Sequence, residues 1–184
     1  MSEQALSVFS LEGYLDWEES QPLRHELVGG RAYVMSGGTE RHGIMQGVIY
    51  ELIAPGARSR GCRPFGPDRK LVTPSGDAYY PDAMICCGPA TDVLYETDAC
   101  LVFEVLSAST RVIDKREKLR SYQDLASIEA YIVVEPDMRR IEVATWPGGE
   151  LGWEVLGPGE IFRTSFGILD LDGIYDQLDA TAST

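Results

Sequence analysis

The spacing of apolar residues changes along this chain between the period of a helix and the period of a strand, as is typical of an α/β domain. Helical spacing covers residues 11–19, 40–53 and 112–126. Strand-like runs cover residues 25–28, 31–35, 63–65, 69–72, 78–87, 99–106, 130–134, 140–144, 153–156 and 161–164. The pattern therefore predicts a few helices and a sheet of many short strands.

Glycine and proline mark the ends of several elements. Gly29-Gly30 separates two strand-like runs by the two residues of a tight hairpin. Pro55-Gly56 is expected to end the second helix, because a proline removes a helical hydrogen bond. The last three strand-like runs are predicted to be edge strands, and residues 179–184 a frayed tail.

The middle of the chain has the order strand, helix, strand. The helix at 112–126 joins the strands at 99–106 and 130–134, and its length is suited to a right-handed crossover. We therefore expect these two strands to be parallel neighbours at the centre of a mixed sheet.

Length and composition limit the class of protein. The 184 residues are the usual size of one domain, so residues 1–184 are expected to form a single unit. The chain shows neither a leader sequence nor an apolar run long enough for a membrane span, which predicts a cytoplasmic protein with no membrane partner.

The cysteine pattern gives no sign of a zinc site or a disulfide framework. No C-x-x-C pair is present, and the adjacent Cys86 and Cys87 would point to opposite faces of a strand. We expect these two thiols, and those of Cys62 and Cys100, to be buried and reduced.

The net charge of −13 argues against a general nucleic-acid binder, since DNA binding depends on lysine and arginine neutralising phosphates. It does not exclude a nuclease. Carboxylates that hold a cation reverse the local potential, and basic residues can gather on one face.

Two carboxylates occupy positions that suggest a metal site. Asp82 follows Pro81 at the start of an apolar run, where it can face a cleft. Glu104 lies inside an otherwise apolar strand, and an unpaired charge buried there would cost several kcal/mol. If the two strands are neighbours, both carboxylates can bind one Mg²⁺ or Mn²⁺ ion.

The predicted helix after the second of these strands supplies further polar groups. Asp114, Lys118 and Tyr122 are spaced four residues apart on one helix face. Lys118 could then stabilise charge on a phosphoryl group or orient an attacking water. The structural alternatives are a capping residue for Asp82, a solvated side chain for Lys118 and a salt bridge for Glu104.

Together these residues resemble the Uma-type (Uma-two) family of restriction endonucleases, in the PD-(D/E)xK nuclease superfamily. The resemblance spans about residues 10–174 and includes Glu26-Leu27-Val28-x-Gly30, His42, Pro81-Asp82, Phe103-Glu104-Val105-Leu106-Ser107, Ser109-Thr110, Asp114, Lys118, Tyr122 and Glu129-Ala130-Tyr131. It implies a restriction-endonuclease-like α/β fold, in which a mixed β-sheet is flanked by helices.

The resemblance also implies roles for individual residues. Asp82 and Glu104 would be the metal ligands, Glu26 a supporting acidic residue, and His42 a capping or supporting residue. His25 has no counterpart in the family and is expected at the surface.

The sequence departs from the superfamily pattern at Leu106, where the lysine of the (D/E)xK triplet would stand. Lys118 matches the lysine of this family instead. Smaller departures are Gly29 for an aspartate, Ala108 for a proline and Ile132 for a tryptophan.

The leading hypothesis is a Mg²⁺-dependent or Mn²⁺-dependent endonuclease that hydrolyses DNA with metal-activated water. One alternative is a binding or scaffold module that keeps the nuclease fold without turnover. Another is a hydrolase of small phosphate esters. A homodimer is expected, because nucleases of this fold that cut both strands often pair two subunits.

Overall fold

The computed structural model describes residues 8–35, 37–90, 92–107 and 117–182. The described helices are α1 (Leu11–Glu18), α2 (Glu40–Ser59), α4 (Leu119–Gln123) and α5 (Leu171–Ala182), with a short 3₁₀ helix η2 (Pro147–Gly149). The strands are β1 (His25–Val28), β2 (Arg31–Val34), β3 (Arg63–Phe65), β4 (Lys70–Val72), β5 (Ala78–Tyr79), β6 (Ala83–Cys86), β7 (Tyr95–Glu96), β8 (Ala99–Val105), β9 (Ala130–Val134), β10 (Ile141–Thr145), β11 (Gly152–Leu156), β12 (Ile161–Thr164) and β13 (Gly167–Asp170).

A six-stranded mixed sheet forms the centre of the molecule, in the order β11-β10-β9-β8-β6-β3. The strands β8 and β9 are parallel, with Glu104 opposite Val133, and the other neighbouring strands are antiparallel. This confirms the parallel pair that the strand, helix, strand order predicted.

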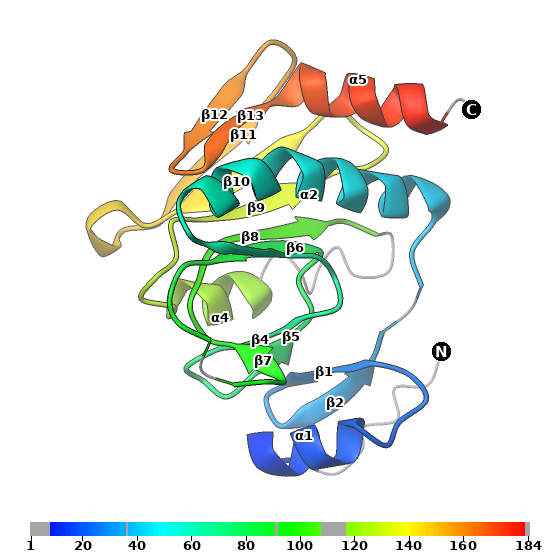
Figure 1. Cartoon of the computed structure of the whole chain (residues 1–184), viewed down its shortest axis with the longest axis vertical. Coiled ribbons are helices and arrows are strands. Elements are labelled where there is room, and N and C mark those ends of the chain that lie inside the picture. Colours follow the sequence, from blue (N-terminus) through cyan, green and yellow to red (C-terminus); the bar gives the residue numbers. More distant parts are fainter. Residues whose placement is uncertain (1–7, 36, 91, 108–116, 183–184) are drawn as a thin grey trace.

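The central sheet is covered on both faces (Figure 1). Phe103 and Val105 of β8 pack with α2 and α5 on one face. Val102 and Leu106 point to the other face, where they pack with Tyr122 of α4 and with strands of the second sheet. Because side chains alternate along a strand, Glu104 belongs to the α4 face.

The second sheet has the order β2-β1-β5-β4-β7 and packs against α1. Its first two strands form the predicted hairpin, and Gly29 and Gly30 occupy the turn with φ angles of 55° and 77°. Both values are costly for residues with a side chain, which explains the pair of glycines. Ser10 caps α1 by accepting a hydrogen bond from the Gly13 N–H.

The strand predicted at residues 78–87 is two strands in two different sheets. β5 pairs with β1 and β4, whereas β6 pairs with β3 and β8. The segment between them contains Pro81, which lacks the N–H needed to continue a ladder, and Asp82. Asp82 therefore lies where the chain passes from one sheet to the other.

The prediction that Pro55-Gly56 ends the second helix is wrong, since α2 continues to Ser59. A proline removes only its own N–H from the helical ladder, and the packing of the buried Ala54 and Ala57 offsets this loss. Gly56 lies directly against the backbone of Phe166, an approach that a side chain would block.

Three other expectations need correction. The helix predicted at 112–126 ends at Gln123, and residues 112–116, including Asp114, lie outside the described residues. β10 is an interior strand of the central sheet, and β12 pairs with β13 in a separate hairpin. Residues 179–182 belong to α5 instead of a frayed tail, because Leu178 is buried and Asp179 pairs with Arg41 at 2.8 Å.

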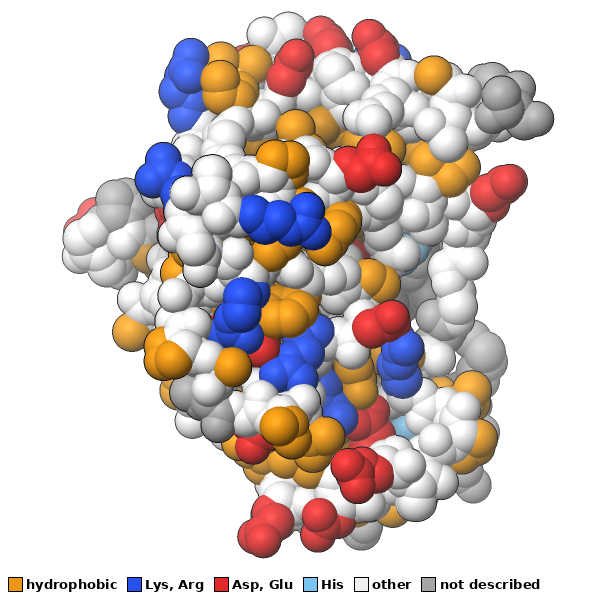
Figure 2. Space-filling model, in the orientation of Figure 1, with side chains coloured by type: hydrophobic (Ala, Val, Ile, Leu, Met, Phe, Trp, Pro, Cys, Tyr) orange, Lys and Arg blue, Asp and Glu red, His pale blue; other side chains and the backbone are white. Residues whose placement is uncertain are grey.

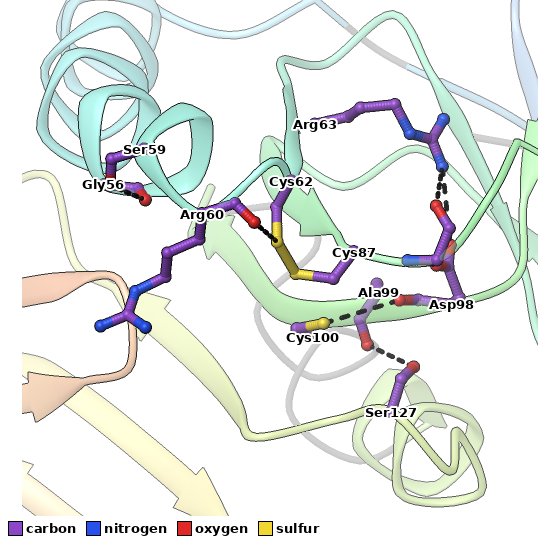
Figure 3. The surroundings of a disulfide bond; sticks show 11 residues. Gly56, Ser59, Arg60, Cys62, Arg63, Cys87, Asp98, Ala99, Cys100 and Ser127 are labelled. Carbon is purple, nitrogen blue, oxygen red and sulfur yellow. Dashed lines mark hydrogen bonds and ion pairs between the residues drawn. A yellow bond between two sulfur atoms is a disulfide. The ribbon is translucent and has the colours of Figure 1, made fainter.

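The cysteine prediction is wrong for two of the four residues. Cys62 and Cys87 form a disulfide (Figure 3), whereas Cys86 and Cys100 are free thiols. Arg63 lies opposite Cys86 in the antiparallel pair of β3 and β6. The residue before Arg63 and the residue after Cys86, which are Cys62 and Cys87, therefore also lie opposite each other. Sequence spacing gives no sign of this contact because it depends on the pairing of β3 with β6. Disulfides are uncommon in the cytosol, so a cytoplasmic location stays a prediction.

None of the helices in the described ranges has the length and apolar composition needed to cross a membrane.

Removal of the disulfide should lower the free energy of unfolding. The bond closes a loop between residues 25 positions apart, and a loop of this size contributes about 3 kcal/mol. We expect the Cys62→Ser/Cys87→Ser double variant to lose that amount in urea unfolding, with Cys100→Ser as the control. Equal urea midpoints for the parent with and without reductant would contradict the expectation.

Candidate functional site

Asp82 is held by groups from two other elements. Its Oδ1 accepts a hydrogen bond from Gln46 Nε2 of α2 at 2.5 Å, and its Oδ2 accepts one from the Val105 N–H at 2.5 Å. The pairing of Ala83 with Phe103, continued by one residue, would set Asp82 opposite Glu104. The carboxylate therefore lies at the end of β6, beside the end of β8.

His42, also on α2, lies beside the same carboxylate. Its Nε2 is 3.0 Å from the Val105 carbonyl oxygen and 3.7 Å from Asp82 Oδ2. The backbone N–H of His42 donates to the Thr39 hydroxyl, which caps α2. The helix start thus fixes the position of the ring, and the ring contacts the candidate ligand.

Burial governs the protonation of Asp82. Loss of solvent raises the pKa of this carboxyl above its ordinary range, and His42, the Val105 N–H and Gln46 oppose the rise. Lys118 also acts to lower the pKa of Asp82, although less than these groups. Its ammonium is thus electrostatically coupled to the carboxyl at the end of β6.

Glu104 is almost completely buried and has the partners that its charge requires. Its Oε1 accepts hydrogen bonds from Lys118 Nζ at 3.0 Å and from the Tyr122 hydroxyl at 3.1 Å. Both donors point from the α4 side of the central sheet, which is the face expected for Glu104. The structure therefore contains the salt bridge that was the structural alternative for Glu104.

Lys118 connects the two large sheets. Its Nζ is 3.0 Å from Glu104 Oε1 on β8 and 3.0 Å from Glu26 Oε1 on β1. The same ammonium lies 5.5 Å from the centre of the Tyr79 ring. Glu26 Oε1 also accepts a hydrogen bond from the Tyr80 N–H at 3.1 Å. One cation thus pairs with two carboxylates that belong to different sheets.

Tyr122 keeps Glu104 in place as a neutral donor. Its side chain is fully buried, and burial together with the charge of Glu104 raises its pKa far above the ordinary range. The ring is packed edge to face between Tyr79 and Tyr131, with centroid separations of 5.4 and 5.2 Å. This packing fixes the orientation of the Tyr122 hydroxyl.

The predicted site residues in the described part of the chain form two groups, and the members of each group are in contact. Glu104 lies with Lys118, Tyr122 and Glu26, and Asp82 lies with His42. Asp114 falls outside the described residues. That the Asp82 and Glu104 carboxylates share one cation stays a prediction.

Sequence reasoning missed Gln46 and misplaced His25. Gln46 follows His42 by one helical turn, and that spacing was the available signal for a second contact with Asp82. His25 was expected at the surface but is buried on β1, against the Trp17 ring at a centroid distance of 4.7 Å.

The donor chemistry of the site fits a hard divalent cation. Carboxylate oxygens are the ligands that Mg²⁺ and Mn²⁺ prefer, and Mg²⁺ commonly takes one or two carboxylates together with water. Within the described ranges, the three-residue group whose ligand atoms all lie within 4.8 Å of one another is instead Cys86, Glu96 and Asp98. An ion held by Asp82 and Glu104 would therefore complete its shell with water or substrate oxygens.

Comparison with known proteins places the chain in a family. The model of the Uma2 family, described as "Putative restriction endonuclease", matches residues 11–165. The chain belongs to the Uma2 family. This confirms the resemblance seen in the sequence.

Two relatives of this Uma2 protein come from Synechocystis sp. and share most of its length. Uncharacterized protein slr1290 is 31% identical over 137 residues, which are 73% of this chain and 72% of the relative. Uncharacterized protein sll1609 is 25% identical over 134 residues, which are 70% of this chain and 76% of the relative.

A solved structure shares the fold of this Uma2 protein. The crystal structure of a putative nuclease belonging to DUF820 from Anabaena variabilis superposes with a TM-score of 0.74 at 15% identity. The match covers 92% of this chain and 99% of that chain. This confirms the predicted restriction-endonuclease-like α/β fold.

The raised pKa of Asp82 predicts a pH-dependent stability. Between its ordinary pKa of 3.8 and the raised value, the folded protein binds more protons than the unfolded chain, so stability falls as the pH rises. The unfolding free energy of the parent should therefore decrease, relative to that of Asp82→Asn, across this interval. Urea unfolding at several pH values measures the difference, and a difference that is constant with pH would refute the assignment.

Replacement of Lys118 should destabilise the fold through the carboxylates that it leaves behind. Breaking a buried ion pair costs about 3–5 kcal/mol, and we expect this loss for Lys118→Met in EDTA. The Lys118→Met/Glu104→Gln double variant should recover part of the loss, because one stranded charge is gone. Urea unfolding of the parent, both single variants and the double variant completes the cycle. Purely additive losses would mean that the pair is not coupled.

Proposed function

We propose that this Uma2 protein is a Mg²⁺-dependent or Mn²⁺-dependent endonuclease that hydrolyses phosphodiester bonds in DNA. The observation that carries the proposal is the position of Lys118 Nζ, 3.0 Å from Glu104 at the centre of the mixed sheet. Lys118 lies after β8 in the sequence. In this proposal it supplies the positive charge that the superfamily's lysine would supply at the position of Leu106. The family description supports the same class of reaction.

Each residue of the site has a distinct task in this proposal. Asp82 and Glu104 would hold the cation, which when bound polarises the phosphate and makes a bound water acidic enough to act as a nucleophile. Gln46 and His42 fix the orientation of Asp82. Lys118 stabilises negative charge on the phosphate, and Glu26 holds the ammonium against the cluster.

The distribution of charge reduces the conflict between an acidic chain and a DNA substrate. Although the net charge is −13, lysine and arginine side chains extend from the upper left to the lower centre of the face shown in Figure 2, with acidic side chains above, below and to the right of them. A polyanion approaching this face meets a more favourable potential than the total charge suggests. DNA affinity should nevertheless fall steeply with salt.

A second candidate function rests on the same ion pair. Lys118 and Tyr122 already satisfy Glu104 Oε1, so the cluster is stable as a structural element without chemistry. A binding or scaffold module that keeps the nuclease fold is therefore the main alternative. A hydrolase of small phosphate esters differs from both in having no need for a DNA-binding face.

Two further parts of the proposal concern the protein as a whole. We propose that the active form is a homodimer, because cleavage of both strands of a duplex requires two sites. We also propose that it acts in the cytoplasm, where intracellular DNA is accessible.

Plasmid nicking at low salt with Mg²⁺ or Mn²⁺ tests the endonuclease. The parent should nick the plasmid, and EDTA should stop the reaction. Glu104→Gln and Lys118→Met should each lower the rate by about 10²–10³-fold, the usual effect of removing one electrostatic contact to the transition state.

Calorimetric titration of the same variants with Mn²⁺ separates the alternatives. Glu104→Gln should bind the ion much more weakly than the parent, because it loses a ligand. If the parent binds the ion but cleaves neither single-stranded nor duplex DNA, the scaffold is the better explanation. Turnover of p-nitrophenyl phosphate without nicking would favour the small-ester hydrolase, and nicking that survives EDTA would indicate a contaminating nuclease.

A further inference from the structure

Three of the four cysteines lie on one face of the central sheet. Cys62 and Cys87 form the disulfide between the start of β3 and the end of β6. Cys62 and Cys100 both pack against the apolar cluster that includes α2 and α5, whereas Cys86 belongs to the cluster on the α4 face. Cys100 is therefore a free thiol on the same side of the sheet as the disulfide.

The strand order gives Cys87 a cysteine on each side. In the central sheet β6 lies between β3 and β8, and Cys100 belongs to β8. Figure 3 shows Cys87 between Cys62 and Cys100. Neighbouring strands are about 4.8 Å apart, so Cys62 and Cys100 are separated by two such spacings, roughly 9.6 Å. A disulfide spans at most about 7 Å between Cα atoms, so Cys87 is the partner that both of the others can reach.

The pairing of β6 with β8 is irregular at Cys100. Ile85 lies opposite Leu101, and the next residue, Cys86, lies opposite Ala99. Cys100 is therefore the extra residue of a β-bulge, and its side chain points to the same face as that of Leu101. Because the ladder is already disrupted at this residue, its side chain can move without breaking a regular pair.

The disulfide lies at the surface, with the free thiol close to it. Cys87 is exposed, and Cys62 and Cys100 are partly exposed. The backbone of Cys87 also forms a hydrogen bond with the Cys100 thiol. Exchange requires a thiol sulfur to approach a disulfide sulfur, and this contact places Cys100 beside the bond that it would attack.

The surroundings of Cys100 determine how fast it can react. Burial raises the pKa of its thiol, the hydrogen bond with the Cys87 backbone opposes the rise, and the charges of Asp98 and Glu129 add to it. Since the thiolate is the nucleophile, attack by Cys100 should be slow at neutral pH and should become faster as the pH rises.

We propose that Cys100 exchanges with the disulfide, so that the bond moves from Cys62–Cys87 to Cys87–Cys100. The Cys100 thiolate attacks the Cys87 sulfur, a bond forms between these two atoms, and Cys62 leaves as a thiolate. Cys62 then takes up a proton in place of the one that Cys100 lost. One disulfide and one thiol are present before and after, so the step consumes no oxidant or reductant.

The position of the bond decides which neighbour of β6 is cross-linked to it. In the first form the bond holds the edge strand β3, and the Cys62 N–H donates to the Ala57 carbonyl oxygen near the end of α2. In the second form the bond joins β6 to β8, which are the strand that follows Asp82 and the strand that contains Glu104. The exchange does not depend on the proposed endonuclease.

Two cysteine variants test which pairs of sulfurs can join. Cys62→Ser, treated with oxidised glutathione and digested with pepsin in acid to stop exchange, should yield linked peptides that contain Cys87 and Cys100. Cys87→Ser is the matched control and should give no link between Cys62 and Cys100, because their strands are not neighbours. A Cys62→Ser protein in which Cys87 carries glutathione and Cys100 remains a thiol would overturn the proposal.

The parent tests the movement of the bond itself. Incubated without reductant and mapped in the same way, it should form the Cys87–Cys100 link about 10-fold faster for each pH unit below the pKa of Cys100. Cys86→Ser should behave as the parent does, because Cys86 lies on the other face, and Cys100→Ser should keep the Cys62–Cys87 link throughout. A parent that shows the Cys62–Cys87 link alone, even at alkaline pH, would rule out the exchange.

Discussion

The structure depends on one buried ammonium. Lys118 lies between Glu104 of the central sheet and Glu26 of the second sheet, 3.0 Å from each, so the charge that makes Glu104 tolerable in an apolar strand also holds the two sheets together. A buried carboxylate without such a partner would cost several kcal/mol. The same requirement explains why Tyr122 and Tyr79 pack around the ion pair, since their rings exclude water.

Much of the local structure could be predicted because it depends on neighbours in the sequence. The hairpin at Gly29-Gly30 and the parallel strands on either side of the helix follow from such local patterns. The errors arise where distant contacts prevail. Pro55 is accommodated because α2 packs on the sheet at both sides of it, and the Cys62 to Cys87 bond depends on the pairing of β3 with β6.

The candidate site shows the same division. Asp82, Glu104 and Lys118 stood out because a charge inside an apolar strand demands a partner, and Glu26 came from the resemblance alone. Gln46 gave only a weak signal, its spacing of one helical turn from His42, because glutamine on a helix surface is common. Its role depends on α2 lying beside Asp82, which is 36 residues further along the chain.

The disulfide turns residues 62–87 into a covalent ring, and this ring contains β3, β4, β5, Asp82 and β6. The ring passes through both large sheets, because β3 and β6 belong to the central sheet and β4 and β5 to the second one. A protease that cuts once inside the ring releases no fragment. On a denaturing gel, such a nicked chain would migrate as one species without reductant and as two pieces with it.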